Sequence, residues 1–215
     1  MNDLTWIVPV LDESGSMGEI KNDAIGAFNN FIKDQRKVEG QANCFLVKFN
    51  TKIEKVYENQ SIQEVPLLNE KTYIPHDWTR LYDAIGHTIN DVKDRIKSLS
   101  DEAKPSKVIF VILTDGKENR SRDFNRAEIF EKIAKREKKG WTFIYLGANQ
   151  DAMEEGGKIG LSRGNTTTWT ADAEGIKYAF AAASTYTEKL RKAKSMAEIQ
   201  SLDLNQEYKD AENKS

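Results

Sequence analysis

The sequence predicts a doubly wound α/β fold, in which a mostly parallel central sheet with one antiparallel edge strand carries helices on both faces. Along the 215 residues, apolar segments of strand length alternate with segments whose apolar residues recur at helical spacing. Residues 108–113 form a continuous apolar run, which is typical of a parallel strand buried on both faces. Strands that alternate with helices favour a parallel sheet between two helical layers.

Strands are expected where apolar residues gather between turn residues, over 4–11, 43–49, 52–58, 108–113, 141–146 and 166–170. Pro9 lies inside the first of these segments and has no backbone N–H to donate, so we expect a local irregularity there. Asn50 and Thr51 separate the second and third segments and favour a hairpin, which makes the third segment the antiparallel edge strand.

Helices are expected where apolar residues recur every three or four positions, over 17–37, 80–99, 122–138, 151–159 and 172–194. Residues 59–79 form a long connection, and loops of that length in compact domains are often functional. We expect one domain over residues 1–195, followed by a polar C-terminal tail over 196–215 that is a weak helix or disordered.

The composition describes a soluble globular chain, with 39% apolar residues, 31% charged residues and a net charge of -2. Because acidic and basic residues are nearly balanced, we expect no nucleic-acid partner. We find no secretory signal and no stretch of about 20 apolar residues, so we expect no membrane segment and a cytoplasmic location. The single cysteine, Cys44, is expected to be a small core residue.

Hydroxyl and carboxylate side chains follow two of the predicted strands and precede one predicted helix. Asp12, Ser14 and Ser16 come directly after the first strand, Asp115 follows the 108–113 strand, and Thr79 precedes the 80–99 helix. In parallel sheets of this kind, ligands bind beyond the carboxyl ends of the strands, where the strand order reverses. Such hard oxygen donors suit Mg²⁺, Mn²⁺ or Ca²⁺ rather than zinc.

These motifs resemble the von Willebrand factor A domain and its metal-ion-dependent adhesion site. The resemblance rests on Asp-x-Ser-x-Ser at 12–16, a threonine opening the Leu-Tyr-Asp-Ala helix at 79–84, and Thr-Asp-Gly at 114–116. It covers about residues 3–195, and the segment 146–152 is similar to stand-alone members encoded by bacteria and phages. Family members often carry glycine shortly before the threonine, where this chain has His76, Asp77 and Trp78.

The resemblance implies a Rossmann-like fold and a role for each residue of the site. Ser14, Ser16 and Thr79 would offer hydroxyl oxygens to one divalent cation, Mg²⁺ first and Mn²⁺ or Ca²⁺ as alternatives. Asp12 and Asp115 would act largely through bound waters. A protein partner would complete the coordination with the carboxylate of an Asp or Glu.

Taken singly, the same residues have simpler interpretations. Asp12 is typical of a helix N-cap, Thr79 of a cap on the next helix, and Asp115 of a turn. Only their joint occurrence in family order favours the metal site. Glu13 is expected to be a solvated neighbour rather than a ligand.

A tentative set of partner-binding residues surrounds the predicted site: Trp78, Arg80, Lys117, Arg120 and Arg122. Trp78 either packs the long loop onto the domain or forms an exposed aromatic contact. The basic residues either form a solvated surface or attract an anionic partner.

A binding module without catalytic activity is therefore the leading hypothesis. Its alternatives are a structural component of a phage or bacterial assembly with a metal-stabilised fold, and, more remotely, a metal-dependent hydrolase. Residues 12–18 supply neither the Gly-x-Ser-x-Gly of a serine hydrolase nor the Gly-x-Gly-x-x-Gly of a dinucleotide enzyme. With only His76 and His87 in the chain, no histidine base is evident.

Overall fold

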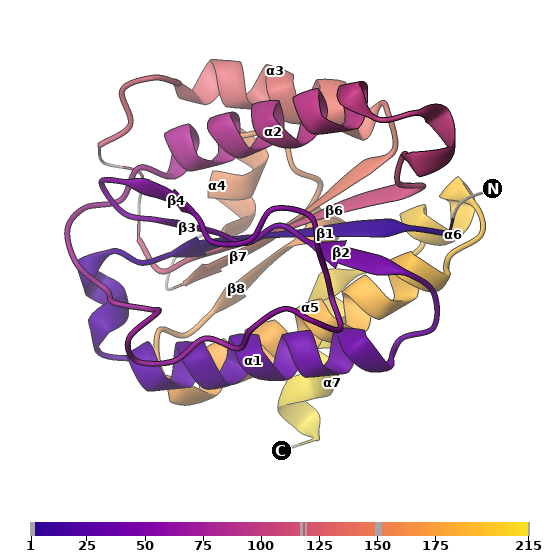
Figure 1. Ribbon diagram of the computed structural model, residues 1–215. Coiled ribbons are helices and arrows are strands. Elements are labelled where there is room, and N and C mark those ends of the chain that lie inside the picture. The colour runs from indigo at the N-terminus through magenta and orange to yellow at the C-terminus, as the bar shows by residue number, and fades with distance from the viewer. Residues whose placement is uncertain (1–2, 117, 119, 149–151, 215) are drawn as a thin grey trace.

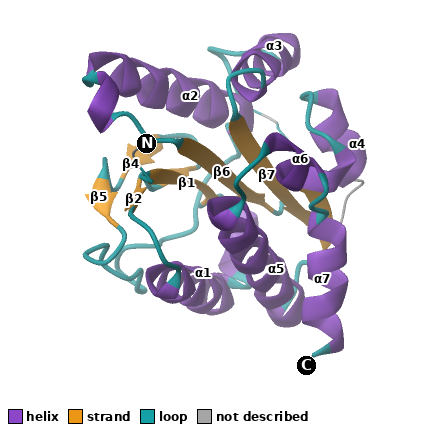
Figure 2. Ribbon diagram, turned by 90° about the vertical axis from the view of Figure 1, so that its right-hand side faces the viewer, coloured by secondary structure: helices purple, strands orange, loops and turns teal. Residues whose placement is uncertain are grey.

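A computed structural model of the chain describes residues 3–116, 118, 120–148 and 152–214, in which a central sheet lies between two layers of helices (Figure 1). Helices α2, α3 and α4 cover one face, and α1, α5 and α7 cover the other, as the view along the sheet also shows (Figure 2). This arrangement confirms the predicted α/β class, including the antiparallel edge strand.

The described sheet has eight strands, in the order β4-β3-β1-β6-β7-β8, with β2 paired to β1 and β5 paired to β2. Their bounds are β1 Thr5–Asp12, β2 Ala42–Cys44, β3 Val47–Phe49, β4 Ile53–Lys55, β5 Gln60–Ser61, β6 Lys107–Thr114, β7 Trp141–Ala148 and β8 Thr166–Trp169. Strand β4 runs antiparallel to β3, and β5 runs antiparallel to β2. Strand β5 lies within the long connection, where the sequence indicated no strand.

The helices of the described chain have the bounds α1 Lys21–Lys37, α2 Leu81–Ser98, α3 Arg126–Glu137, α4 Ala152–Lys158, α5 Ala173–Lys192, α6 Met196–Gln200 and α7 Leu204–Asn213. Short 3₁₀ turns occur at Gly15–Gly18, Asp101–Ala103 and Arg163–Asn165. Each face of the sheet buries its own apolar cluster, one against α1 and α5 and the other against α2 and α3. No helix in the described ranges combines the length and hydropathy needed to cross a bilayer.

Pro9 lies in the middle of β1 without breaking it, and pairs in register with Val111 of β6. The irregularity falls in the neighbouring strand instead: the predicted strand 43–49 is two strands, β2 and β3, with Phe45 and Leu46 between them. The backbone of Ile7 accepts a hydrogen bond from the Phe45 amide on this side. The backbone polar groups of alternate residues in a strand point to the same neighbouring strand, so those of Pro9 and Ile7 face the same side. The N–H that Pro9 lacks would therefore point to the gap between β2 and β3.

Two helices begin later than the sequence indicated. The 17–37 segment starts with a 3₁₀ turn, and α1 begins only at Lys21. Helix α3 begins at Arg126, where Asn125 and Glu128 form a reciprocal capping box. The residues before Asn125 are held by another helix, as described below, and therefore do not join α3.

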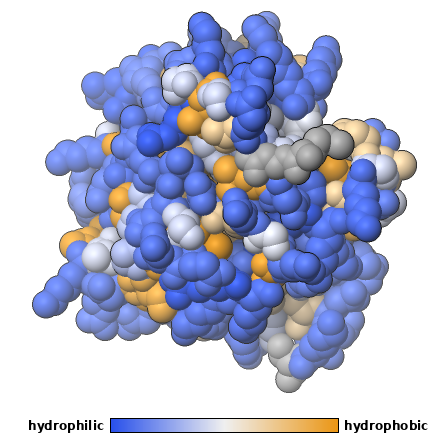
Figure 3. Space-filling model, turned by 45° about the vertical axis from the view of Figure 1, so that its right-hand side comes forward, coloured by the Kyte–Doolittle hydropathy of each residue, from blue (hydrophilic) through white to orange (hydrophobic). Residues whose placement is uncertain are grey.

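The predicted tail contains two short helices. Leu204 of α7 is fully buried, and Glu207 pairs with Lys189 of α5. The division of the chain at residue 195 stays a prediction. On the side of the molecule shown in Figure 3 the surface is mainly hydrophilic, with scattered apolar residues.

The strand order reverses at β1, whose neighbours are β3 on one side and β6 on the other. Helix α1 leaves the end of β1 toward one face, while α2 and α3 pack on the opposite face. The carboxyl ends of β1 and β6 therefore border the crevice in which α/β folds bind ligands.

Candidate metal centre

The five predicted site residues meet at this crevice, and three separate loops supply them. Asp12 ends β1, and Ser14 and Ser16 lie in the turn that follows it. Thr79 lies two residues before α2, and Asp115 directly follows β6. Asp12, Ser14 and Thr79 are buried, whereas Ser16 is exposed and Asp115 is half-buried. The site therefore opens to solvent on the side of Ser16 and Asp115.

Hydrogen bonds connect the oxygens of the site. The Ser14 and Ser16 hydroxyl oxygens lie 3.2 Å apart, and Ser16 Oγ donates to Asp115 Oδ1 at 2.7 Å. One oxygen of Asp12 accepts the backbone N–H of Ser14 at 2.8 Å. The other accepts the Thr114 hydroxyl at 2.5 Å. Side chains far apart in the sequence are thus brought within a few ångströms of one another.

Gly116 shows that these oxygens face a common point. A Cβ built on Gly116 would lie 3.1 Å from Thr79 Oγ1, and 3.9 Å from both Asp12 Oδ2 and Ser16 Oγ. Oxygens from the loop after β1 and from the loop before α2 therefore border, together with Gly116 of the third loop, a space that a single methyl group would fill. Glycine leaves this space open.

Burial disfavours the ionised form of the two carboxyl groups in the metal-free site. Desolvation raises the pKa of Asp12 from 3.8 to about 6, although hydrogen bonds from Thr114 and Ser14 act in the opposite direction. Desolvation also raises the pKa of Asp115. Two nearby carboxylates that are poorly solvated favour a bound cation, because it would compensate their charge.

The chemistry of the donors fits a hard divalent cation. All five side chains offer oxygen, and three of them are neutral hydroxyls. Among the described residues, no group of three or more His, Cys, Asp or Glu side chains is placed to hold a metal. A zinc-type cluster of nitrogen and sulfur ligands is therefore absent from that part of the chain.

The loop before Thr79 follows a glycine-like path without a glycine. Asp77 has a φ of 63°, in the left-handed region that glycine usually occupies. Its carbonyl accepts the N–H of Gly15, and the N–H of His76 donates to the carbonyl of Glu13. These contacts hold the loop against the serine turn, so the sequence departure from the family pattern at residues 76–78 leaves Thr79 within the site.

Glu13 is buried, which corrects the expectation of a solvated neighbour. Its carboxylate accepts a hydrogen bond from Lys48 Nζ at 2.9 Å and from the backbone N–H of Ile74 at 2.6 Å. Lys48 also donates to the carbonyl of Thr72. The pair therefore ties the serine turn and β3 to the long loop that carries Thr79. Sequence alone gave no signal for this pair, because Lys48 alternates with apolar residues as a surface residue would.

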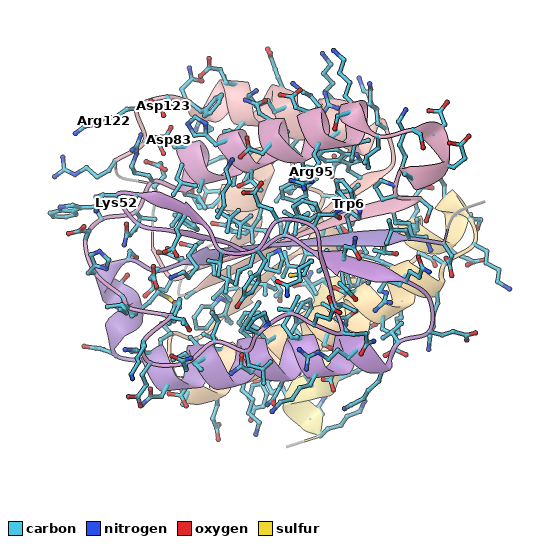
Figure 4. The ribbon with its side chains drawn as sticks, viewed as in Figure 1. Trp6, Lys52, Asp83, Arg95, Arg122 and Asp123 are labelled. Atoms are coloured by element: carbon cyan, nitrogen blue, oxygen red, sulfur yellow. The ribbon has the colours of Figure 1, made fainter. Side chains whose placement is uncertain are left out.

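Asp83, in the first turn of α2, organises the loop after Asp115. Its buried carboxylate accepts the backbone N–H groups of Arg122, Asp123 and Phe124, each at 2.9 Å, and the Nε of Arg80 at 2.8 Å. Figure 4 shows Asp83, Arg122 and Asp123 together at this edge of the molecule. Burial alone raises the pKa of Asp83, but these hydrogen bonds outweigh it and leave the pKa below its ordinary value.

The tentative partner-binding residues differ in their surroundings. Trp78 is 56% exposed, and the Arg120 guanidinium lies 4.7 Å from its ring centroid. Arg122 is exposed as well. Arg80, in contrast, pairs with Asp83 at 2.6 Å and with Asp123 at 3.4 Å, so carboxylates of the domain itself largely compensate its charge. Lys117 lies outside the described residues.

The family of the chain follows from comparison with known sequences. The sequence model of the von Willebrand factor type A domain matches residues 7–182. The chain belongs to this family. Its members are usually adhesion modules without catalytic activity. No curated protein sequence matches the chain significantly.

Solved structures of the same fold include a mussel protein and a protein of Plasmodium vivax. Proximal thread matrix protein 1 of the mussel byssus superposes with a TM-score of 0.60 at 16% identity, over 88% of this chain and 48% of that one. A second structure of the mussel protein, described with a zinc-occupied MIDAS motif, gives a TM-score of 0.58 at 15% identity, with the same coverage. The manganese-loaded TRAP protein of Plasmodium vivax gives 0.55 at 17% identity, over 79% of this chain and 70% of that one.

The chain spans about half the length of the mussel protein. At these identities the likeness concerns the fold. The segment 146–152, which resembles bacterial and phage members, falls partly outside the described residues.

Proposed function

We propose that the domain is a metal-dependent protein-binding module, in which one divalent cation coordinates an Asp or Glu carboxylate of a protein partner. Five residues would hold the cation: Asp12, Ser14, Ser16, Thr79 and Asp115. The observation that carries the proposal is the common point at the crevice of the sheet, where Asp12, Ser16 and Thr79 present oxygens beside Gly116 of the third loop.

The donor set favours Mg²⁺, with Mn²⁺ or Ca²⁺ as substitutes. Because Asp12 and Asp115 would act largely through bound waters, the direct contacts would come from neutral hydroxyls, and the cation would stay electrophilic toward a carboxylate from outside. Exposure of Ser16 and partial exposure of Asp115 give such a carboxylate access from solvent. The zinc and manganese named for the two structural neighbours support a divalent ion in this chain.

A basic and aromatic surface beside the site would select the partner. Trp78, Arg120 and Arg122 are exposed on the loops that flank Thr79 and Asp115. Their chemistry fits a partner whose coordinating Asp or Glu lies within an acidic patch. Exposed charges of this kind act mainly on the association rate, and salt screens them beyond about 8 Å.

Affinity capture from the lysate of the native host tests this function directly. Immobilised parent protein and Ser14→Ala are each exposed to lysate in 1 mM MgCl₂ or in EDTA. We expect a partner that is retained only by the parent, and only with Mg²⁺. Retention of the same proteins in all four samples would contradict a metal-mediated contact.

A kinetic measurement then tests the surface beside the metal. Reversal of Arg120 and Arg122 to Glu should slow association with the captured partner several-fold at low salt and leave dissociation nearly unchanged. The matched control is a reversal of Lys33 and Lys177 to Glu, because these exposed lysines lie on α1 and α5. Equal association rates for all three proteins would show that the arginines do not face the partner.

The alternative of a purely structural metal predicts a different result. In that case the chain would unfold in chelator at room temperature. We expect the fold to survive, because two apolar clusters on either side of the sheet form the core. Placement among stand-alone bacterial or phage members, and a cytoplasmic location, stay predictions.

A further inference from the structure

A second concave surface lies at the opposite end of the sheet, where β6 and β7 begin. It has a volume of about 590 Å³, and its walls are the C-terminal ends of α2 and α3 and the loop that leads into β6. Figure 2 is viewed from this end of the sheet. Small-molecule sites usually have volumes of roughly 300–1,000 Å³, so this hollow is of suitable size.

The lining of the hollow is strongly basic. Six of its residues are cationic and one, Asp94, is acidic. The cationic residues are Lys93, Lys97, Lys104, Lys135, Arg136 and Lys139. Because the whole chain has a net charge of -2, this density of positive charge is local to the hollow and is not a general property of the surface.

Stabilisation of helix ends accounts for only part of this charge. Cations near a helix C-terminus offset the helix dipole, which places about half a negative charge at the C-terminus of each helix. Two helix ends and Asp94 therefore balance about two of the six cations. Lys93 pairs with Asp94 at 2.8 Å, and Lys104 pairs with Asp101 just outside the hollow. Within the described residues, Lys97, Lys135 and Lys139 have no acidic partner within ion-pair distance.

The basic residues of the hollow also affect a neighbouring lysine. Desolvation and repulsion from Lys93, Arg136 and Lys135 lower the pKa of Lys132. The Arg136 guanidinium lies 5.4 Å from the ring centroid of Trp141, which places a planar cation against an aromatic wall. The hollow thus combines lysine ammonium groups with one cation that an aromatic ring helps to position.

We propose that this hollow binds a small molecule that carries a chain of two or three phosphates. With Lys104 paired to Asp101, about three positive charges stay uncompensated, which is close to the charge of a diphosphate and offsets most of the charge of a triphosphate. Five of the six cations are lysines, which bind phosphate as point charges, whereas flat carboxylates favour the paired contacts of arginine. A compact ligand also fits better than a long nucleic acid, because the chain outside the hollow has a net negative charge.

Isothermal titration calorimetry with sodium tripolyphosphate tests the proposal. Titrations are carried out at 50 mM NaCl in EDTA, so that no divalent ion takes part. We expect a micromolar Kd for the parent and at least a tenfold weaker Kd for Lys97→Glu/Lys135→Glu. Both lysines are exposed, so the fold should tolerate the substitutions.

Two controls change charge at sites outside the hollow. The double variant Lys33→Glu/Lys177→Glu has the same change in net charge, on the other face of the sheet, and should keep the parent's Kd within threefold. Asp12→Asn should keep it as well, so the result does not depend on the proposed metal site. A second arm with ATP and AMP distinguishes the sources: equal Kd values for ATP and tripolyphosphate indicate recognition of the phosphates alone, and tighter ATP binding indicates a nucleotide.

The proposal is overturned if the parent binds neither tripolyphosphate nor ATP at 1 mM. It is also overturned if both double variants weaken binding equally, because binding would then follow net charge and not the hollow. Binding of a poly-glutamate peptide or single-stranded DNA in place of tripolyphosphate would assign the surface to a macromolecule and equally overturn it.

Discussion

Replacement of Asp12 by Asn should stabilise the metal-free protein at pH 8 while it abolishes metal binding. Asn has nearly the same shape as Asp, and its carbonyl can still accept the Ser14 N–H at the position of Asp12 Oδ1. Its amide can donate to the Thr114 hydroxyl, which now donates to Asp12 Oδ2. The substitution therefore removes a buried charge and leaves the surrounding packing unchanged.

The size of the expected stabilisation follows from the pKa of Asp12, which burial raises from 3.8 to about 6 in the folded protein. The folded state therefore binds this proton more tightly than the unfolded state. The resulting stability is complete below about pH 4 and is lost as the pH rises through about 6. The corresponding cost of the ionised form is about 3 kcal/mol at pH 8. Because Asn is itself polar and buried, we expect a net gain of roughly 1–3 kcal/mol.

Urea denaturation in EDTA, at pH 8 and again at pH 4.5, measures this difference. The gain of Asp12→Asn over the parent should be largest at pH 8 and much smaller at pH 4.5. Asp23→Asn removes an exposed carboxylate from the first turn of α1 and should cost a few tenths of a kcal/mol at most. If Asp12→Asn is less stable than the parent at pH 8, the ionised Asp12 carboxylate does not destabilise the metal-free fold and this reasoning is wrong.

Three further outcomes concern the site and its supports. Gly116→Ala should weaken Mg²⁺ binding at least tenfold in calorimetry, because its Cβ would fill the space beside Thr79. Gly18→Ala should leave the affinity unchanged, because a Cβ at Gly18 meets nothing within 4 Å. Equal affinities of the two variants for Mg²⁺ would show that Gly116 does not border the site. Asp83→Ala should lower the free energy of unfolding in urea by about 3–5 kcal/mol, because it leaves three backbone amides and the Arg80 Nε without their acceptor. Asp123→Ala should lower it by at most about 1 kcal/mol, and similar losses for the two variants would contradict the role of Asp83. Removal of the metal by a chelator should lower the free energy of unfolding only by the binding linkage, which is about 2.7 kcal/mol for an ion concentration of 100 times the Kd. The melting temperature should fall accordingly, and the protein should stay folded at 25 °C.

The fold class could be predicted because its signals are local. Apolar runs such as 108–113 identify buried parallel strands, and the helical spacing in 80–99 identifies α2 to within one residue at each end. The prediction was less accurate where tertiary contacts decide the boundary. Helix α3 begins four residues later than expected, because Asp83 accepts the amides of residues 122–124.

The candidate site could be predicted as a set of residues but not as a geometry. The order of Asp12, the two serines, Thr79 and Asp115 identified the family, which the match over 7–182 confirms. Their role as metal ligands stays a proposal. The open space beside Gly116 and the left-handed Asp77 depend on contacts between loops, and no pattern within a single segment reveals them.

The buried pairs were missed for a related reason. Lys48 and Glu13 are charged residues in positions that sequence reasoning assigns to the surface. Their burial depends on a partner 35 residues away. The only signal for Asp83 was its place in the Leu-Tyr-Asp-Ala motif, which indicates a family position but not a contact.

A crystal soaked in Mn²⁺ tests the central claim most directly. An anomalous difference map should show one strong peak per chain, within coordination distance of the Ser14 and Ser16 hydroxyls and close to Thr79 and Gly116. The same map for Asp12→Asn should lack it. A map of the parent without a peak at this position, or with its main peak at another site, would contradict the proposed metal centre.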